Sequence, residues 1–186
     1  MDVHMHKVFP MEALEGKDVF SIMNKTIPIL EGMGINYWAS AGTVLGLVRE
    51  EKGYIDWDTD IDFETYATTI ELNNLKALMV ANGFELIRHM EEDGLYYQIA
   101  FIDKATNIIV DFYCYYKVSD TMLECKTDVG TLQLPIHFIN DKKLVKGYKC
   151  PSPVEDYLVY RYGSTWKTPI KKTTGWQDTA GEALRR

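Results

Sequence analysis

The chain has 186 residues, of which 46% are hydrophobic and 25% are charged, and its formal net charge is −7. This length fits one ordinary domain, and this composition excludes a disordered, low-complexity or disulfide-dense chain. The acidic balance, with 27 Asp and Glu against 20 Lys and Arg, also disfavours a basic nucleic-acid-binding surface.

The cysteines and the N-terminal residues indicate the cellular compartment of the protein. Cys114, Cys125 and Cys150 have neither CxxC spacing nor an even number, which is typical of free thiols in a reducing compartment. The N-terminus lacks the cationic segment and apolar core of a signal peptide, and no apolar run approaches the ~18 residues of a membrane-spanning helix. We therefore expect a cytoplasmic protein without direct membrane insertion; its oligomeric state is not indicated.

The first part of the chain alternates helices and strands. Apolar residues at helical spacing predict a helix over residues 17–33, with a kink at Pro28, and two glycines near its end terminate it. A strand over 35–39 follows. A tight turn at 40–43 then leads into a short helix over 44–49.

Strands dominate the later part of the chain. A strand centred on residues 60–63 precedes an amphipathic helix over 68–82, and the apolar face of that helix carries Ile70, Leu72, Leu75, Leu78 and Met79. Five further strands are predicted at 84–88, 95–102, 108–116, 121–125 and 131–134. A helix over 153–162 ends the folded part, and the polar residues 173–186 are expected to form a mobile tail. Residues 1–172 are thus predicted to be one α+β domain with a mixed β-sheet flanked by helices.

The most informative stretch is Trp-Asp-Thr-Asp-Ile-Asp-Phe at residues 57–63. On a strand, alternation places Asp58, Asp60 and Asp62 on one face, about 7 Å apart, with the intervening apolar residues in the core. Bare carboxylates at that distance repel one another unless a cation lies between them. Oxygen ligands without His or Cys favour Mg²⁺ or Mn²⁺ over zinc. The alternative is an exposed edge strand, but Asp is a poor strand former.

A further acidic position interrupts the apolar and aromatic strand over residues 108–113. A buried lone carboxylate such as Asp111 is costly unless it is paired or bound to a metal. Alone, Asp111 is better interpreted as a strand-end or salt-bridged residue. Beside Asp60 and Asp62, it would supply a third metal ligand.

Residues between the first strand and the acidic run are candidates for binding phosphate. Gly42 and Thr43 precede a helix, where glycine permits close approach and unpaired N–H groups suit a phosphate. Arg49 and Lys52 either contact a diphosphate or are solvated surface cations. Trp57 either packs in the core or contacts a nucleotide base or a quaternary ammonium group.

The remaining histidines and tyrosines are given structural roles. His89 and His137 lack partners in any visible constellation, so we expect structural or surface positions for both. Five strand tyrosines are expected to pack in the sheet: Tyr96, Tyr97, Tyr113, Tyr115 and Tyr116.

Together, the Gly-Thr turn, the Asp-x-Asp strand and the later strand Asp resemble the catalytic core of the nucleotidyltransferase fold. More narrowly, residues 41–62 (AGTVLGLVREEKGYIDWDTDID) resemble the signature of the LicD family, which includes bacterial phosphocholine transferases and is related to fukutin and fukutin-related protein. Residues 153–169 are similar to the C-terminal segment of that family. The resemblance covers residues 18–170.

The resemblance implies transfer of a phospho-alcohol group from a CDP-linked donor to a sugar hydroxyl of a glycan, with release of CMP. The donor would be CDP-choline, CDP-ribitol or CDP-glycerol. Asp60 and Asp62 would bind Mg²⁺ or Mn²⁺, Asp111 would complete the catalytic site, and Asp58 would be an additional ligand. Two alternatives stay open: a nucleotidyltransferase that uses an NTP to modify a small molecule or a protein, and a non-catalytic nucleotide- or sugar-binding module.

Overall fold

The computed structural model describes residues 2–6, 9–171 and 181–185, and its centre is a six-stranded sheet in the order β1-β4-β5-β6-β3-β2. The strands are β1 (Asp2–Met5), β2 (Asn36–Ala39), β3 (Asp60–Tyr66), β4 (Phe84–Glu92), β5 (Leu95–Asp103) and β6 (Ile109–Cys114). Strands β3 and β6 are parallel, and the other neighbouring strands are antiparallel. The sheet is therefore mixed, as predicted.

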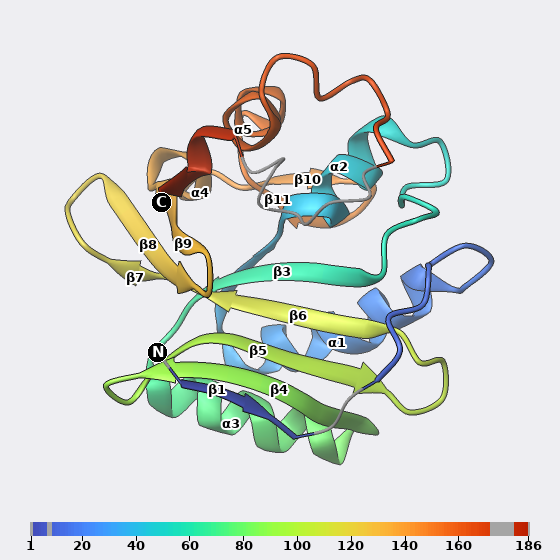
Figure 1. Cartoon of the computed structure of the whole chain (residues 1–186), viewed down its shortest axis with the longest axis vertical. Helices are drawn as coiled ribbons and strands as arrows, with labels where there is room; N and C mark the ends of the chain where they lie inside the picture. Colours follow the sequence, from blue (N-terminus) through green and yellow to red (C-terminus); the bar gives the residue numbers. More distant parts are fainter. Residues whose placement is uncertain (1, 7–8, 172–180, 186) are drawn as a thin grey trace.

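Five α-helices accompany the sheets in the described part of the chain: α1 (Val19–Met33), α2 (Ala41–Arg49), α3 (Thr69–Ala81), α4 (His137–Asn140) and α5 (Val154–Tyr162). Helices α1 and α3 pack against each other, and α3 lies along β4 and β5, whereas α2 and α5 lie above β3 in the view of Figure 1. This arrangement confirms the predicted α+β fold. Helix α1 runs through Pro28 without interruption, and α2 begins at Ala41 rather than at Val44.

The expectation of a single sheet was wrong. A second, antiparallel sheet has the order β12-β9-β8-β7, and a separate hairpin joins β10 to β11. These strands are β7 (Tyr116–Lys117), β8 (Met122–Thr127), β9 (Gly130–Pro135), β10 (Lys143–Val145), β11 (Tyr148–Cys150) and β12 (Leu184–Arg185). The strand predicted over 108–116 is divided into two: β6 ends at Cys114, and Tyr116 pairs with Glu124 in the second sheet.

Part of the predicted polar tail belongs to the second sheet. Residues 181–183 form a 3₁₀ turn in which Ala183 is buried, and β12 pairs with β9. Residues 172–180 lie outside the described residues.

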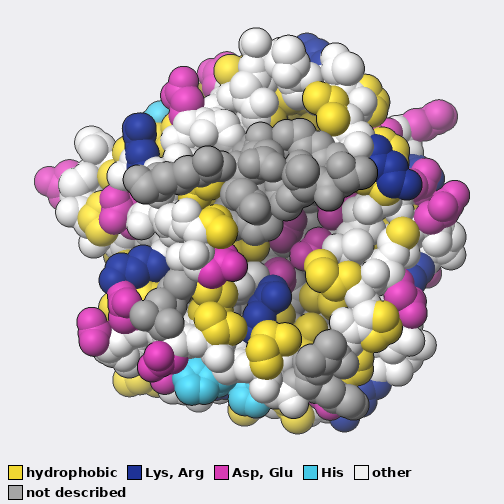
Figure 2. All heavy atoms as spheres, in the orientation of Figure 1, with side chains coloured by type: hydrophobic (Ala, Val, Ile, Leu, Met, Phe, Trp, Pro, Cys, Tyr) yellow, Lys and Arg dark blue, Asp and Glu magenta, His cyan; other side chains and the backbone are white. Residues whose placement is uncertain are grey.

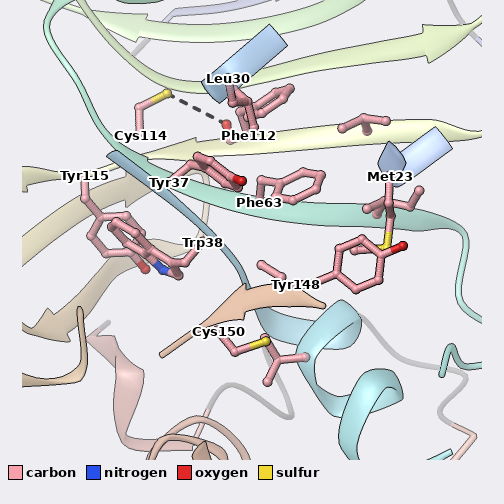
Figure 3. Close-up of a cluster of buried hydrophobic side chains, with 14 of the residues drawn as sticks. Met23, Leu30, Tyr37, Trp38, Phe63, Phe112, Cys114, Tyr115, Tyr148 and Cys150 are labelled. Atoms are coloured by element: carbon pink, nitrogen blue, oxygen red, sulfur yellow. Dashed lines mark hydrogen bonds between the residues drawn. The ribbon is translucent and has the colours of Figure 1, made fainter. Parts of the chain in front are cut away.

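The core between β3, β6 and α1 fixes which side chains of β3 are buried. Phe63 on β3 stacks on Phe112 on β6 with ring centroids 5.8 Å apart, and both rings lie near Leu30 of α1 (Figure 3). Ile61 is also buried, so the predicted apolar face of β3 is confirmed. By alternation, the aspartates of β3 must face the other way.

The predicted apolar face of α3 was wrong in part. In α3, Ile70 is 74% exposed and Leu78 is 40% exposed, because the buried stripe is the narrower set Leu72, Leu75 and Met79. His89 is buried, as expected of a structural residue, and it has partners that the sequence did not reveal, because β1 pairs with β4 and places His4 directly opposite it. The strand β1 was not predicted from the sequence. The three cysteines are buried free thiols, as expected.

Candidate active site

Three carboxylates meet on the face of the sheet opposite the α1 core. In the parallel pairing of β3 with β6, Asp62 lies directly beside Asp111, and Asp60 is two residues earlier on the same face of β3. Asp60, Asp62 and Asp111 each offer a carboxylate oxygen, and these oxygens all lie within 4.8 Å of one another. The set predicted from separate parts of the sequence is therefore brought together.

Asp58 reaches the same place from outside the strand. It was expected on β3, but β3 begins at Asp60, and Asp58 lies in the preceding loop, where its carboxylate accepts a hydrogen bond from the N–H of Thr59 at 3.1 Å. A Cβ atom at Gly42 would lie 2.2 Å from Asp58 Oδ2 and 3.6 Å from Asp62 Oδ2. The first turn of α2 therefore touches the carboxylates, and a side chain larger than that of glycine would displace the Asp58 carboxylate.

The site is short of positive charge. Burial raises the pKa of Asp60 to about 7, with a further rise from the charge of Asp58, while Arg88 opposes the shift. Burial also raises the pKa of Asp111 to about 7 and that of Asp58 to about 6. The pKa of Asp62 is raised well above its usual value by burial and then by the neighbouring carboxylates. A divalent cation would relieve this repulsion, and an all-oxygen donor set suits Mg²⁺ or Mn²⁺.

Two polar residues at the site were missed by the sequence analysis. Arg88 donates from Nη2 to Asp111 Oδ2 at 3.0 Å, and Gln98 donates from Nε2 to the same oxygen at 3.1 Å. Arg88, Ala100 and Asp111 lie opposite one another across β4, β5 and β6, so the guanidinium passes over a small side chain.

An irregularity in strand pairing places Arg88 in that row. Leu86 pairs with Phe101, but Arg88 pairs with Ala100, so Ile87 is an extra residue. Such a bulge redirects the side chains that follow it and is frequent beside functional sites. The alternation of residue types around position 88 carries no signal of a bulge, so Arg88 could not have been assigned to this face from the sequence.

The start of α2 is locked onto β3. The N–H of Asp62 donates to Thr43 Oγ1 at 2.8 Å, and the N–H of Ser40 donates to the carbonyl of Asp62 at 3.1 Å. Ala41 has a φ of 42°, a conformation unusual for a residue other than glycine, and its N–H donates to the hydroxyl of Tyr157 on α5 at 3.2 Å. Gly42 and Thr43, in the first turn of α2, line one pocket together with Asp58 and Asp60.

Three other predicted site residues make contacts within the protein. Arg49 donates to Glu50 at 2.7 Å and to the carbonyl of Trp166 at 3.2 Å. Lys52 pairs with Asp56, and the half-buried Trp57 packs against the core. Substrate contact by Arg49, Lys52 or Trp57 stays a prediction.

A buried polar network lies between β3 and α5. Glu64, the next residue of β3 on the aspartate face, accepts hydrogen bonds from Trp38 Nε1 at 2.7 Å and from the Tyr115 hydroxyl at 3.2 Å. Burial raises the pKa of Glu64, and the charge of Arg161 on α5 opposes that rise. Residues 153–162, singled out in the sequence, therefore adjoin the aspartate face of β3, and α5 lies above this strand in Figure 1.

In the space-filling view, acidic side chains lie at the bottom of a hollow near the middle of one face, with a basic side chain beside them (Figure 2). No helix within residues 2–6, 9–171 and 181–185 is long and apolar enough to cross a membrane.

The parallel strand pair with its aspartates, approached by the first turn of a helix, defines a nucleotidyltransferase fold. The solved structure of the lincosamide antibiotic adenylyltransferase LnuA, lincomycin-bound, has this fold: it superposes with a TM-score of 0.51 at 15% sequence identity, covering 82% of this chain and 89% of that one. A family model described as the nucleotidyltransferase domain of LicD/FKTN/FKRP matches residues 34–150. The chain belongs to the LicD family.

Two curated relatives are similar to the chain. The mouse ribitol-5-phosphate transferase FKTN is 27% identical over an alignment of 176 residues, and the match covers 88% of this chain and 35% of that protein. The human ribitol 5-phosphate transferase FKRP is 25% identical over an alignment of 122 residues, and the match covers 61% of this chain and 24% of that protein. The chain thus spans about a third and a quarter of the length of these two relatives.

Proposed function

We propose that this protein is a metal-dependent phosphotransferase that moves a phospho-alcohol group from a CDP-linked donor to a sugar hydroxyl of a glycan and releases CMP. The observation that carries the proposal is the juxtaposition of Asp62 and Asp111 across β3 and β6, with Asp60 within reach of both. Among the possible donors, the names of the two relatives favour CDP-ribitol over CDP-choline.

The donor set fits a hard divalent cation. Asp60, Asp62 and Asp111 would hold Mg²⁺ or Mn²⁺, with Asp58 as an additional ligand from the loop. When bound, the ion would neutralise the donor diphosphate and stabilise charge on the leaving CMP. Gln98 and Arg88 both donate to Oδ2 of Asp111, so they fix the orientation of that carboxylate.

The reaction is a displacement at phosphorus. The acceptor hydroxyl oxygen forms a bond to the phosphorus that carries the alcohol, and the bond from that phosphorus to the CMP oxygen breaks. The hydroxyl proton passes to a carboxylate of the site, for which Asp111 is the candidate. Because little covalent chemistry is required of the protein, alignment of the two substrates carries much of the rate.

The phosphate contacts come from α2 and its surroundings. The first turn of α2, with Gly42 and Thr43, would hold the donor phosphates through its N–H groups and its positive dipole end. Arg49 and Lys52 would add positive charge after leaving their present partners. Trp57 would lie against the donor. All of these residues lie within residues 1–172, the range that the sequence predicts to be one domain.

A turnover assay tests the proposal. The protein is incubated with Mg²⁺, a glycan mixture and one donor at a time, and both the nucleotide product and the mass of the glycans are measured. We expect CMP release with a glycan mass gain of one phospho-alcohol. The activity should be lost in Asp62→Asn, a variant expected to fold because it removes one charge from a repulsive cluster. Asp120→Asn, at an exposed turn, is the control.

Other products would overturn the proposal. Release of pyrophosphate from CTP or ATP, with a nucleotide attached to the acceptor, would identify a nucleotidyltransferase. Nucleotide binding without any turnover of these donors would identify a binding module.

A further inference from the structure

A second group of metal-binding side chains lies at the outer edge of the six-stranded sheet. His4 on β1 and His89 on β4 lie directly opposite each other, and both approach Glu91 on β4. His4 Nε2 lies 3.7 Å from Glu91 Oε1, and His89 Nε2 lies 3.7 Å from Glu91 Oε2. Each of the three residues offers a ligand atom within 4.8 Å of the other two.

This group is separate from the aspartate site. Neighbouring residues on a strand point to opposite faces, so His89 faces away from the side on which Arg88 reaches Asp111. The His89 ring meets the edge of Tyr96, with centroids 5.5 Å apart, and Tyr96 accepts a hydrogen bond from Lys76 of α3. The histidine group thus lies on the α3 side of the sheet. Figure 2 shows histidine side chains at the lower edge of the molecule, away from the acidic hollow.

A fourth residue prepares His89 as a ligand. His6 Nε2 lies 2.8 Å from His89 Nδ1, a hydrogen bond. When His89 Nδ1–H is the donor in this bond, the lone pair of His89 is on Nε2, the nitrogen that faces Glu91. Metal-binding histidines commonly donate their second N–H in this way, which fixes the tautomer and the ring orientation.

We propose that His4, His89 and Glu91 bind one zinc ion, with His6 as a positioning residue. Two imidazoles and one carboxylate form a donor set that zinc uses, and zinc ligands in a tetrahedron lie about 3.3–3.5 Å apart, close to the two separations to Glu91. The rings of His4 and His89 are stacked, with centroids 4.5 Å apart and an angle of 19°. Coordination therefore requires the His4 ring to turn, and its side chain is 47% exposed.

The consequence of zinc binding would be attachment of the first strand. All four residues of β1 are exposed, so little apolar burial holds this strand on the sheet. A metal ion shared between His4 of β1 and two residues of β4 would fasten β1 and protect the edge of the sheet.

Zinc titration of the full chain, produced without a polyhistidine tag, tests the proposal. The titrated protein carries the double substitution Asp60→Asn and Asp62→Asn, so that the aspartate site does not contribute to zinc binding. The result is then independent of whether the protein has the proposed transferase activity. We expect one zinc ion per chain, measured by calorimetry, and an affinity at least 100-fold lower in His89→Gln or Glu91→Gln. The variant His6→Gln should bind roughly 10- to 100-fold more weakly.

The fourth histidine of the chain provides the control. His137 lies at the start of α4, and His137→Gln should leave zinc affinity unchanged. Nitrogen chemical shifts of the imidazoles give an independent measurement: zinc should shift Nε2 of His4 and His89 and leave His137 unaffected. Equal affinities for His89→Gln and His137→Gln, or an absence of zinc binding by the protein with the double substitution alone, would overturn the proposal.

Discussion

The charge balance of the aspartate site depends on a few single side chains. Asp62 and Asp111 are buried side by side, and like charges at that distance are unfavourable without a compensating cation. Arg88 supplies part of that compensation through its bond to Asp111. The guanidinium is therefore expected to matter most when no divalent ion is present.

The variant Arg88→Gln should destabilise the metal-free protein by on the order of 1–3 kcal/mol, because it leaves Asp111 with a weaker partner. Since a bound divalent ion would take over the compensation, Mg²⁺ should raise the melting temperature of Arg88→Gln more than that of the wild type. Thermal unfolding with and without Mg²⁺ measures the difference. Arg185→Gln, on the second sheet, is the control, and an equal gain in Arg88→Gln and the wild type would contradict this account.

Gly42 is the position where the α2 backbone comes closest to the carboxylates. An alanine there would place its Cβ 2.2 Å from Asp58 Oδ2, so the Asp58 carboxylate must move from its present position. We expect Gly42→Ala to fold, since alanine is the better helix former by about 1 kcal/mol. Turnover should fall on the order of 100-fold, as expected for a small misplacement of a catalytic group.

The matched control for Gly42→Ala is Gly32→Ala in α1, where a Cβ atom would meet nothing within 4 Å. Gly32→Ala should keep full activity. If both variants were equally active, the contact between α2 and Asp58 would have no role in catalysis.

Among the secondary-structure elements, those with a strong periodic pattern could be predicted and the irregular ones could not. The two faces of β3 could be predicted because aspartates alternate with the apolar residues Ile61 and Phe63, which are buried on one face. The pairing of β3 with β6, which creates the site, is a long-range contact that no local pattern encodes. The bulge at Ile87 and the edge strand β1 depend on partners far away in the sequence, and for that reason Arg88 and the His4–His89 pair were missed.

One ion pair ties α1 to the turn between β5 and β6. Lys25 of α1 pairs with Asp103, whose Oδ2 also accepts hydrogen bonds from the N–H of Thr106 at 2.9 Å and from the N–H of Ala105 at 3.1 Å. Burial alone would raise the pKa of Asp103, but the hydrogen bonds from Lys25 and Thr106 outweigh it and hold the pKa below its usual value.

A lowered pKa means that this stabilisation is present above the pKa of the unfolded chain, about 3.9, and is lost as the pH falls through the folded value. We therefore expect Asp103→Asn to be less stable than the wild type at pH 6, with the gap narrowing as the pH falls below about 4. Urea unfolding at a series of pH values measures this gap. A constant gap from pH 6 to pH 3 would show that ionised Asp103 contributes nothing.

In the molecule as a whole, the site is assembled on the six-stranded sheet from residues that are far apart in the sequence. Residues 41–62 and Asp111 provide the carboxylates and the first turn of α2, while α5 holds Ala41 through Tyr157 and Glu64 through the charge of Arg161. Family membership could be predicted from residues 41–62, because that run is long and specific. The donor alcohol could not be predicted, because Trp57, the aromatic candidate beside the carboxylates, suits a nucleotide base as well as a quaternary ammonium group.

The central claim is that the aspartates bind a divalent ion and that this ion recruits a CDP-linked donor. Calorimetric titration of CDP-ribitol into the protein, with and without Mg²⁺, tests it most directly. We expect binding by the wild type only with Mg²⁺, and no binding by Asp62→Asn under either condition. Equally tight binding without divalent ions, or by Asp62→Asn, would contradict the claim.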